Sequence, residues 1–274
     1  MTDIIPEFAP YADEIRATAR PSVRFTLKAG SAELWDSKVG GNPYLPQGME
    51  YPRNAEGQPM ALLAQINFAQ MPALPDYPAE GILQFFICDD GLMGMDFDNM
   101  VQHDGSGFRV IYHPQVQTEG LQHDFPDLEN EDGGLPFEFG KEYRMVFQNA
   151  EQQYMSLEDY RFESSMPKLN RFLEDKAEEE DYDWTLHEKY GDAFFCETHR
   201  IGGYPFFTQE DPRAYANSVM PQDYELLFQL ASDCGKDQEV EVMWGDAGVG
   251  GFFIRPEDLK KRDFSKVAYN WDCC

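Results

Sequence analysis

Short apolar runs carry most of the hydrophobic pattern of this chain. Residues 62–66 and 81–87 form one pair of such runs, and residues 226–230 and 248–254 form another. All four are apolar or aromatic and are bounded mainly by glycine, proline or aspartate, which is typical of buried strands rather than helices. We therefore predict that each pair of runs forms antiparallel sheet.

Helical periodicity is confined to two other segments. In residues 3–19, apolar side chains recur every three or four positions, which predicts a helix with one apolar face that ends before Pro21. Its apolar positions are Ile4, Phe8, Tyr11 and Ile15.

A second helix is predicted over residues 156–178, with Ser156 as its N-cap. Its apolar side is formed by Leu169, Phe172 and Leu173. The acidic run at residues 174–183 follows, and repulsion between its charges indicates a solvated helix end or loop that connects two halves of the chain.

Three sequence blocks recur in the same order in the two halves. KVGGNPY at 38–44 returns as RIGGYPF at 200–206, LLAQI at 62–66 as LLFQL at 226–230, and GILQFFI at 81–87 as GVGGFFI at 248–254. Because the spacing between copies changes by only a few residues, we interpret the pattern as an internal duplication. The sequence thus predicts a sheet-rich α+β fold in a single compact domain, with a pseudo-twofold axis. The domain covers residues 1–274. Within it, the repeats lie at about 22–112 and 190–264, and an acidic helical connector lies at 150–189.

The first repeat also resembles a known family. The segments SKVGGNPYLP (37–46), EYP (50–52), GQP (57–59), LAQIN (63–67) and GILQFF (81–86) resemble the YwqG-like family of uncharacterised bacterial proteins. The likeness is specific over residues 37–90 and looser elsewhere, where it includes RIGGYP (200–205) and GFFI (251–254). The resemblance implies a mixed, sheet-dominated fold and supplies neither a reaction nor catalytic residues.

Charge narrows the possible partners. The 274 residues include 50 acidic and 22 basic side chains, so the formal net charge is −28. Such a charge opposes binding to nucleic acids and anionic membranes and attracts basic proteins, although it also serves solubility. No apolar stretch approaches the length of a membrane span, and Asp3 and Glu7 stand where an export signal would be basic. We expect a cytoplasmic protein.

Cysteine and histidine positions indicate neither a metal site nor a disulfide framework. The cysteines are odd in number and lack metal-ligand spacing: Cys88, Cys196, Cys234, Cys273 and Cys274. His103, His113 and His123 recur every ten residues, a spacing that fits no metal motif. Cys196 has His187 and His199 nearby in sequence, but its apolar, strand-like surroundings at 193–196 favour a buried inert thiol over a nucleophile.

The two Gly-Gly segments give the best candidate site. Small residues let backbone N–H groups approach an anion, and a cation precedes each segment. The sequence lacks the other features of a phosphate loop, so a tight turn with positive φ before a strand is the favoured alternative. With a pseudo-twofold axis, Lys38 and Arg200 would meet in one central cleft. A glutamine within an apolar run needs buried hydrogen-bond partners, either loop backbone or a ligand. The candidate ligand-binding residues are Lys38, Gly40, Gly41, Gln65, Arg200, Gly202, Gly203 and Gln229.

Two functions remain open. The favoured one is a non-catalytic binding or interaction protein whose acidic surface docks a basic partner, such as a toxin or a regulatory protein. The alternative is a protein or enzyme that binds a small anion between the repeated halves. The sequence identifies no catalytic residues and no cofactor motif, and among 50 acidic residues no carboxylate pair can be singled out.

Overall fold

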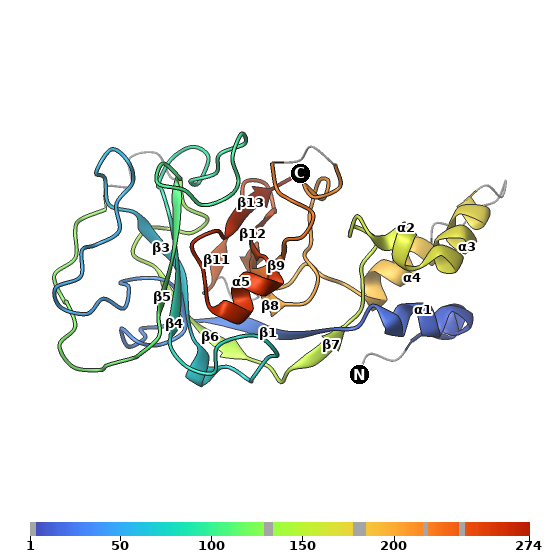
Figure 1. Ribbon diagram of the computed structural model, residues 1–274, viewed down its shortest axis with the longest axis horizontal. Helices are drawn as coiled ribbons and strands as arrows, with labels where there is room; N and C mark the ends of the chain where they lie inside the picture. The colour runs from blue at the N-terminus through green and yellow to red at the C-terminus, as the bar shows by residue number, and fades with distance from the viewer. Residues whose placement is uncertain (1–3, 129–133, 178–184, 216–218, 236–238) are drawn as a thin grey trace.

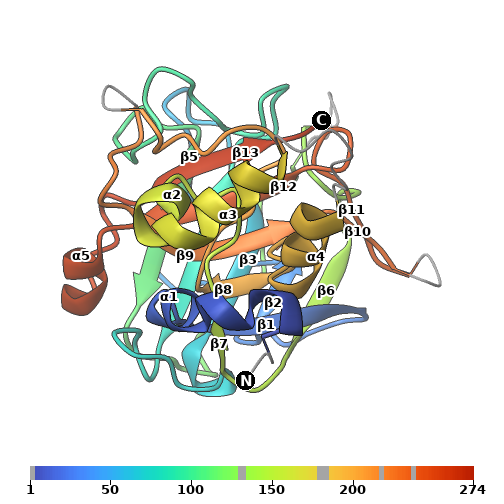
Figure 2. The same cartoon turned by 90° about the vertical axis from the view of Figure 1, so that its right-hand side faces the viewer.

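A computed structural model of the chain describes residues 4–128, 134–177, 185–215, 219–235 and 239–274. The fold is sheet-rich α+β. Antiparallel strands form a nearly closed, barrel-like sheet, and helices α1–α4 gather beside it (Figure 1). Figure 2, which looks from the helical side, shows these helices in front of the strands.

The described strands are mostly short, as the sequence predicts. They are β1 (Arg20–Ala29), β2 (Lys38–Gly40), β3 (Ala61–Asn67), β4 (Ile82–Ile87), β5 (Phe108–His113), β6 (Glu142–Phe147), β7 (Glu151–Gln153), β8 (Arg200–Gly202), β9 (Glu225–Ala231), β10 (Asp233–Cys234), β11 (Glu241–Val242), β12 (Val249–Ile254) and β13 (Ala268–Asp272). The helices are η1 (Pro6–Tyr11), α1 (Ala12–Ala17), η2 (Phe68–Gln70), α2 (Phe162–Ser165), α3 (Pro167–Ala177), α4 (Thr185–Ala193) and α5 (Pro256–Lys261).

Strand pairing follows one continuous path. The order is β13-β12-β9-β8-β1-β6-β2-β3-β4-β5, with β7 paired to β1 beside this path and β10-β11 forming a separate two-stranded sheet. Residues ahead of β5 reach back to the opposite edge, where Val101 forms a β-bridge with Ala268 and the Gln102 amide donates to the Val267 carbonyl. These contacts bring the two edges of the sheet together.

The strands on the two sides of the central β1–β6 pair are matched in register. Thr26 of β1 lies opposite Val146 of β6 at the middle of the path. On one side Lys38 of β2 lies opposite Gln65 of β3, and on the other Arg200 of β8 lies opposite Gln229 of β9. In this arrangement β6 stands beside β2 as β1 stands beside β8. Strand β6 lies outside both predicted repeats, 22–112 and 190–264.

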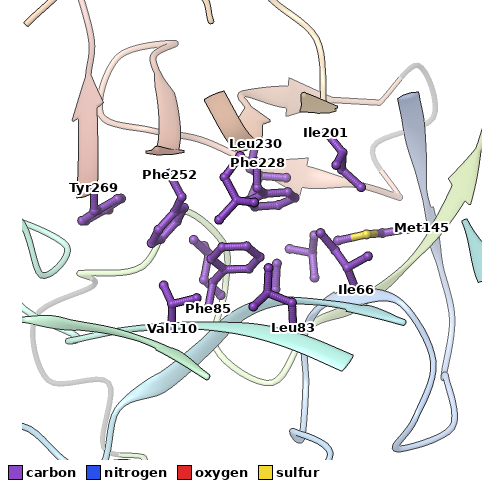
Figure 3. Packing of buried hydrophobic residues seen from close by; sticks show 14 of the residues in the cluster. Ile66, Leu83, Phe85, Val110, Met145, Ile201, Phe228, Leu230, Phe252 and Tyr269 are labelled. Atoms are coloured by element: carbon purple, nitrogen blue, oxygen red, sulfur yellow. The ribbon is translucent and has the colours of Figure 1, made fainter. Parts of the chain in front are cut away.

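Aromatic rings from both sides of the path fill the interior (Figure 3). Phe85 stacks on Phe228 with ring centroids 4.7 Å apart, and Phe252 stacks on Tyr269 at 4.6 Å. Each such ring removes on the order of 200 Å² of apolar surface from water. Because side chains alternate along a strand, the inward Val39 places its neighbour Lys38 on the outer face.

The N-terminal helix is confirmed over a shorter span. A 3-10 turn, η1, precedes α1, and β1 already begins at Arg20, so Pro21 lies in a strand. Phe8 and Ile15 are fully buried against the other helices, as the apolar face predicts. Residue 3 lies outside the described part of the chain.

The prediction of one helix over 156–178 is wrong in detail. Helix α2 begins only at Phe162, so Ser156 does not cap it. The helix breaks at Met166 because Pro167 has no N–H group, and α3 continues from there with Leu169 and Leu173 buried. Of the acidic run at 174–183, residues 178–183 fall outside the described residues. The strand-like run at 193–196 is not a strand, since it is the end of α4 and the coil that follows.

Membrane-spanning helices are absent from the described segments, because each helix there is too short or too polar to cross a bilayer.

Candidate functional site

Both Gly-Gly segments adopt the left-handed conformation that the sequence predicts. The φ angles are +69° at Gly40 and Gly41, +68° at Gly202 and +77° at Gly203. The turns follow β2 and β8 rather than preceding a strand. A Cβ on Gly41 would lie 2.5 Å from the Glu142 carboxylate, so the absence of a side chain there makes room for that carboxylate.

The paired glutamines bind loop backbone. The Gln65 side-chain carbonyl accepts from the Tyr44 amide, and its NH2 group donates to the carbonyls of Leu34 and Asp36. Gln229 repeats this arrangement with the Phe206 amide and the carbonyls of Cys196 and Thr198. Each amide thereby fixes the loop that leads into β2 or β8 and the aromatic residue that follows the Gly-Gly turn.

Lys38 has a counterion within the protein. Its side chain is 1% exposed, and Nζ lies 2.7 Å from Oε1 of Glu142. A buried ammonium needs such a partner, because removing a charge from water without compensation costs several kcal/mol. Lys38 is therefore neutralised without a ligand.

Arg200 has no such counterion among the residues that the structure describes. The residue is 1% exposed, and its guanidinium donates only to neutral acceptors, the Thr198 hydroxyl and the Phe195 carbonyl. Nη1 is buried without a hydrogen-bond partner. Burial consequently lowers the pKa of the guanidinium, which the negative charge of Glu151 only partly offsets.

The register explains this difference between the two cations. Glu142, which neutralises Lys38, lies opposite Gly40 on β6. The corresponding position, opposite Gly202, is occupied by Ser22 of β1. Ser22 is fully buried, and its hydroxyl also lacks a hydrogen-bond partner. An uncharged residue thus stands at the position that supplies the counterion on the other side of the sheet.

Arg200 lines a cavity of about 230 Å³ between β1, β7, β8 and the end of α4. Arg24, which lies directly opposite Arg200 in the sheet, contributes a second guanidinium. It is already paired with Glu151, since Nε lies 2.6 Å from one carboxylate oxygen and Nη2 donates to the other at 3.0 Å. Asp192 and Phe195 also line the cavity. The cavity therefore combines one neutralised arginine with one that has no close counterion in the described segments.

Lys38 and Arg200 do not meet in one cleft. Three strand spacings and four residues of register separate them, which corresponds to about 20 Å along the sheet. The structure instead groups Arg200 with Arg24 and Glu151, which sequence reasoning did not single out. The alternation of Val23, Phe25 and Leu27 predicts an outward-facing polar residue at position 24, but it gives no indication of its partner.

The histidines and cysteines singled out in the sequence are not part of the cavity lining, although the Cys196 thiol contacts Gln153 and Phe194, which are. His113 is buried in β5, where Nε2 lies 2.8 Å from the Gln84 side-chain carbonyl. His199 Nε2 lies 3.2 Å from an Asp233 carboxylate oxygen. The Cys196 thiol is buried and donates to the Phe194 carbonyl, and burial raises its pKa, as expected of an inert thiol. Within the described residues, no three or more metal-ligating side chains cluster.

Fold and site place the chain among sheet-rich α+β proteins whose nearly closed antiparallel sheet carries buried cations on its outer face. More narrowly, the chain belongs to the family described as a domain of unknown function, DUF1963, which matches residues 37–273. No curated protein matches the chain. Family membership thus brings no assigned reaction.

Proposed function

We propose that this protein binds a small anion, a carboxylate or a phosphate ester, in the cavity lined by Arg200 and Arg24. The observation that carries the proposal is that Arg200 lines this cavity and that its buried Nη1 has no hydrogen-bond partner among the described residues. A bound anion would act as the counterion of Arg200, as Glu142 does for Lys38. Nη1 carries two N–H donors, and their hydrogen bonds to a carboxylate or phosphate oxygen would be charge-assisted.

The experiment is a calorimetric titration with acetate, succinate and inorganic phosphate. The wild type is expected to bind at least one of these anions, and Arg200→Gln is expected to lose that binding. Arg144→Gln is the matched control, because Arg144 occupies beside Lys38 the register position that Arg24 occupies beside Arg200. Equal binding by wild type and Arg200→Gln would refute the proposal.

A second variant tests the missing counterion directly. Ser22→Asp places a carboxylate at the position that corresponds to Glu142, so it is expected to pair with Arg200 and to compete with an added anion. Near-ultraviolet circular dichroism checks that each variant retains its packing. Unchanged anion binding by a folded Ser22→Asp protein would count against the register argument.

We propose docking of a basic protein as a second candidate function, supported by the formal net charge of −28. Attraction between opposite surfaces speeds association and weakens as salt screens it. Purified protein coupled to beads is expected to retain a basic partner from lysate at low salt and to release it at high salt. Arg200→Gln should leave this capture unchanged, whereas it removes the binding of small anions.

We also propose a narrower family placement, a cellular location and an internal duplication for this protein. The segment over residues 37–90 supports placement in the YwqG-like branch of bacterial proteins. The five cysteines, all of which are free, support a location in the reducing cytoplasm. The repeated sequence blocks and the matching register of β2–β3 and β8–β9 support an internal duplication. In that duplication, the first strand of each repeat would pair with the second strand of the other.

A further inference from the structure

Four charged side chains line the Arg200 cavity. Arg24 and Glu151 form an ion pair, whereas Arg200 and Asp192 do not pair with another charged group in the described chain. Arg24 and Glu151 hold each other through two short contacts, so together they present little net charge to a ligand. Arg200 remains as a cation whose Nη1 has no hydrogen-bond partner within the described ranges. Arg200 therefore provides the positive charge of the cavity. The other charged groups of the lining determine which further charge a ligand needs.

That remaining wall carries a free carboxylate. Asp192, in the last turn of α4, is exposed and lines the cavity. Its carboxylate makes no hydrogen bond or ion pair with any other residue in the described part of the chain. A simple anion bound to Arg200 would thus lie in a cavity that also contains an unpaired negative group. A ligand that carries both a negative and a positive group can pair with Arg200 and with Asp192.

We infer that the ligand is a zwitterion of α-amino acid type. This inference rests on the proposed anion site and specifies its ligand class. The ligand carboxylate pairs with Arg200, and the ammonium group pairs with Asp192. Charge-assisted hydrogen bonds of this kind are the strongest polar contacts that a small ligand makes.

Cavity size and lining agree with this ligand class. A volume of about 230 Å³ is smaller than the roughly 300–1,000 Å³ of pockets for drug-sized ligands, so it suits a single metabolite of amino-acid size. Phe195 lines the same cavity with its side chain about half exposed and provides an apolar surface. An amino acid with an aromatic or aliphatic side chain can pack against this ring while its charged end lies between Arg200 and Asp192.

The test uses ligand pairs that differ only in the amino group. Phenylalanine is compared with 3-phenylpropionate, and leucine with 4-methylpentanoate, by calorimetric titration of the full chain. The amino acid of at least one pair is expected to bind about tenfold more tightly than its amine-free analogue. Asp192→Asn is expected to bring that amino acid down to the level of its analogue. Glu188→Gln removes an exposed carboxylate one turn earlier on α4, outside the cavity lining, and is expected to leave the preference intact.

The outcomes separate this inference from the proposal beneath it. If amino acids and their analogues bind equally well to the wild type, or if Asp192→Asn keeps the preference, the zwitterion inference is overturned and the anion site stands. If neither class binds and the simple anions also fail, both proposals fall together. Amino-acid binding that survives Arg200→Gln would place the ligand elsewhere and overturn the inference as well.

Discussion

Lys38 Nζ lies 2.7 Å from Oε1 of Glu142, and this contact neutralises a cation that the fold removes almost completely from water. The two residues are 104 positions apart in the chain and are brought together by the pairing of β2 with β6. Across the sheet, the corresponding pairing of β8 with β1 gives Arg200 no such partner. Stability measurements can therefore distinguish a structural cation from a ligand-binding one.

Glu142→Gln is expected to destabilise the protein by about 3 kcal/mol, because it leaves the buried Lys38 ammonium without a counterion. The free energy of unfolding in urea measures the effect. Glu138→Gln is the control, since Glu138 pairs with Lys141 on the surface and both side chains are more than half exposed. Its loss is expected to stay below about 1 kcal/mol. Similar losses for the two variants would show that the Lys38 pair is not effectively buried.

Replacing Arg200 is expected to raise the free energy of unfolding, whereas Glu142→Gln lowers it. Arg200→Met removes an uncompensated buried charge, so the ligand-free protein should become more stable by about 1 kcal/mol. Lys38→Met should destabilise it, because Glu142 then loses its partner. Thermal and urea unfolding of both variants check the pair. A large destabilisation by Arg200→Met would mean that the arginine is mainly structural and would weaken the anion-site proposal.

The two buried glutamines should respond alike to substitution. Gln65→Leu and Gln229→Leu each leave one amide and two carbonyls of a loop without their partner, and a buried unpaired group costs about 1–3 kcal/mol. We expect a loss of about 3 kcal/mol or more for each in urea unfolding. A difference of more than about 2 kcal/mol between them would show that the two loops are held in different ways.

Sequence patterns predicted the continuous apolar strands and missed the alternating ones. Strands β3, β4, β9 and β12 stand out because both of their faces are buried. Strand β6 instead has an alternating pattern, in which Tyr143 and Met145 are buried and Arg144 between them is exposed. This period of two indicates a half-buried strand. The break at Pro167 was also readable, because proline disfavours a helical conformation at the residue before it.

The candidate site was only partly accessible to such reasoning. The repeated blocks single out Arg200 as a cation before a Gly-Gly turn, but they also predict that Lys38 acts with it. Their difference depends on Glu142 and Ser22, whose positions follow from strand register between distant segments. A single sequence does not encode that register in any local pattern, so the counterion and its absence became visible only in the fold.

His113 should make stability depend on pH in the weakly acidic range. Burial lowers the pKa of its imidazole from 6.5 to about 4, so between these values the unfolded chain binds a proton that the folded protein does not. The free energy of unfolding should therefore fall as the pH drops from 6.5 to 4, by about 2–3 kcal/mol from this residue. Urea unfolding of wild type and His113→Gln across this range isolates the effect. Parallel pH profiles for the two proteins would contradict the expectation.

A buried ionic cluster should determine stability at still lower pH. Asp159 contacts Arg161 at 2.6 Å and Arg213 at 3.4 Å, while Glu225 contacts Arg161 at 2.6 Å and also pairs with Arg20. Burial disfavours both carboxylates in their charged form, but the arginines outweigh it and lower the pKa of Asp159 and of Glu225.

Because these folded-state pKa values lie below the ordinary values of 3.8 and 4.5, the stabilisation by Asp159 and Glu225 is present above about pH 4.5 and is lost as the pH falls through the folded values. Asp159→Asn is expected to flatten the acid limb of the stability profile by up to one proton and to destabilise the protein near neutrality, where Arg213 loses a partner. Asp13→Asn alters a carboxylate that is fully exposed beside Arg16 and should leave the profile unchanged. An acid limb of the same slope in wild type and Asp159→Asn would assign acid unfolding to other carboxylates.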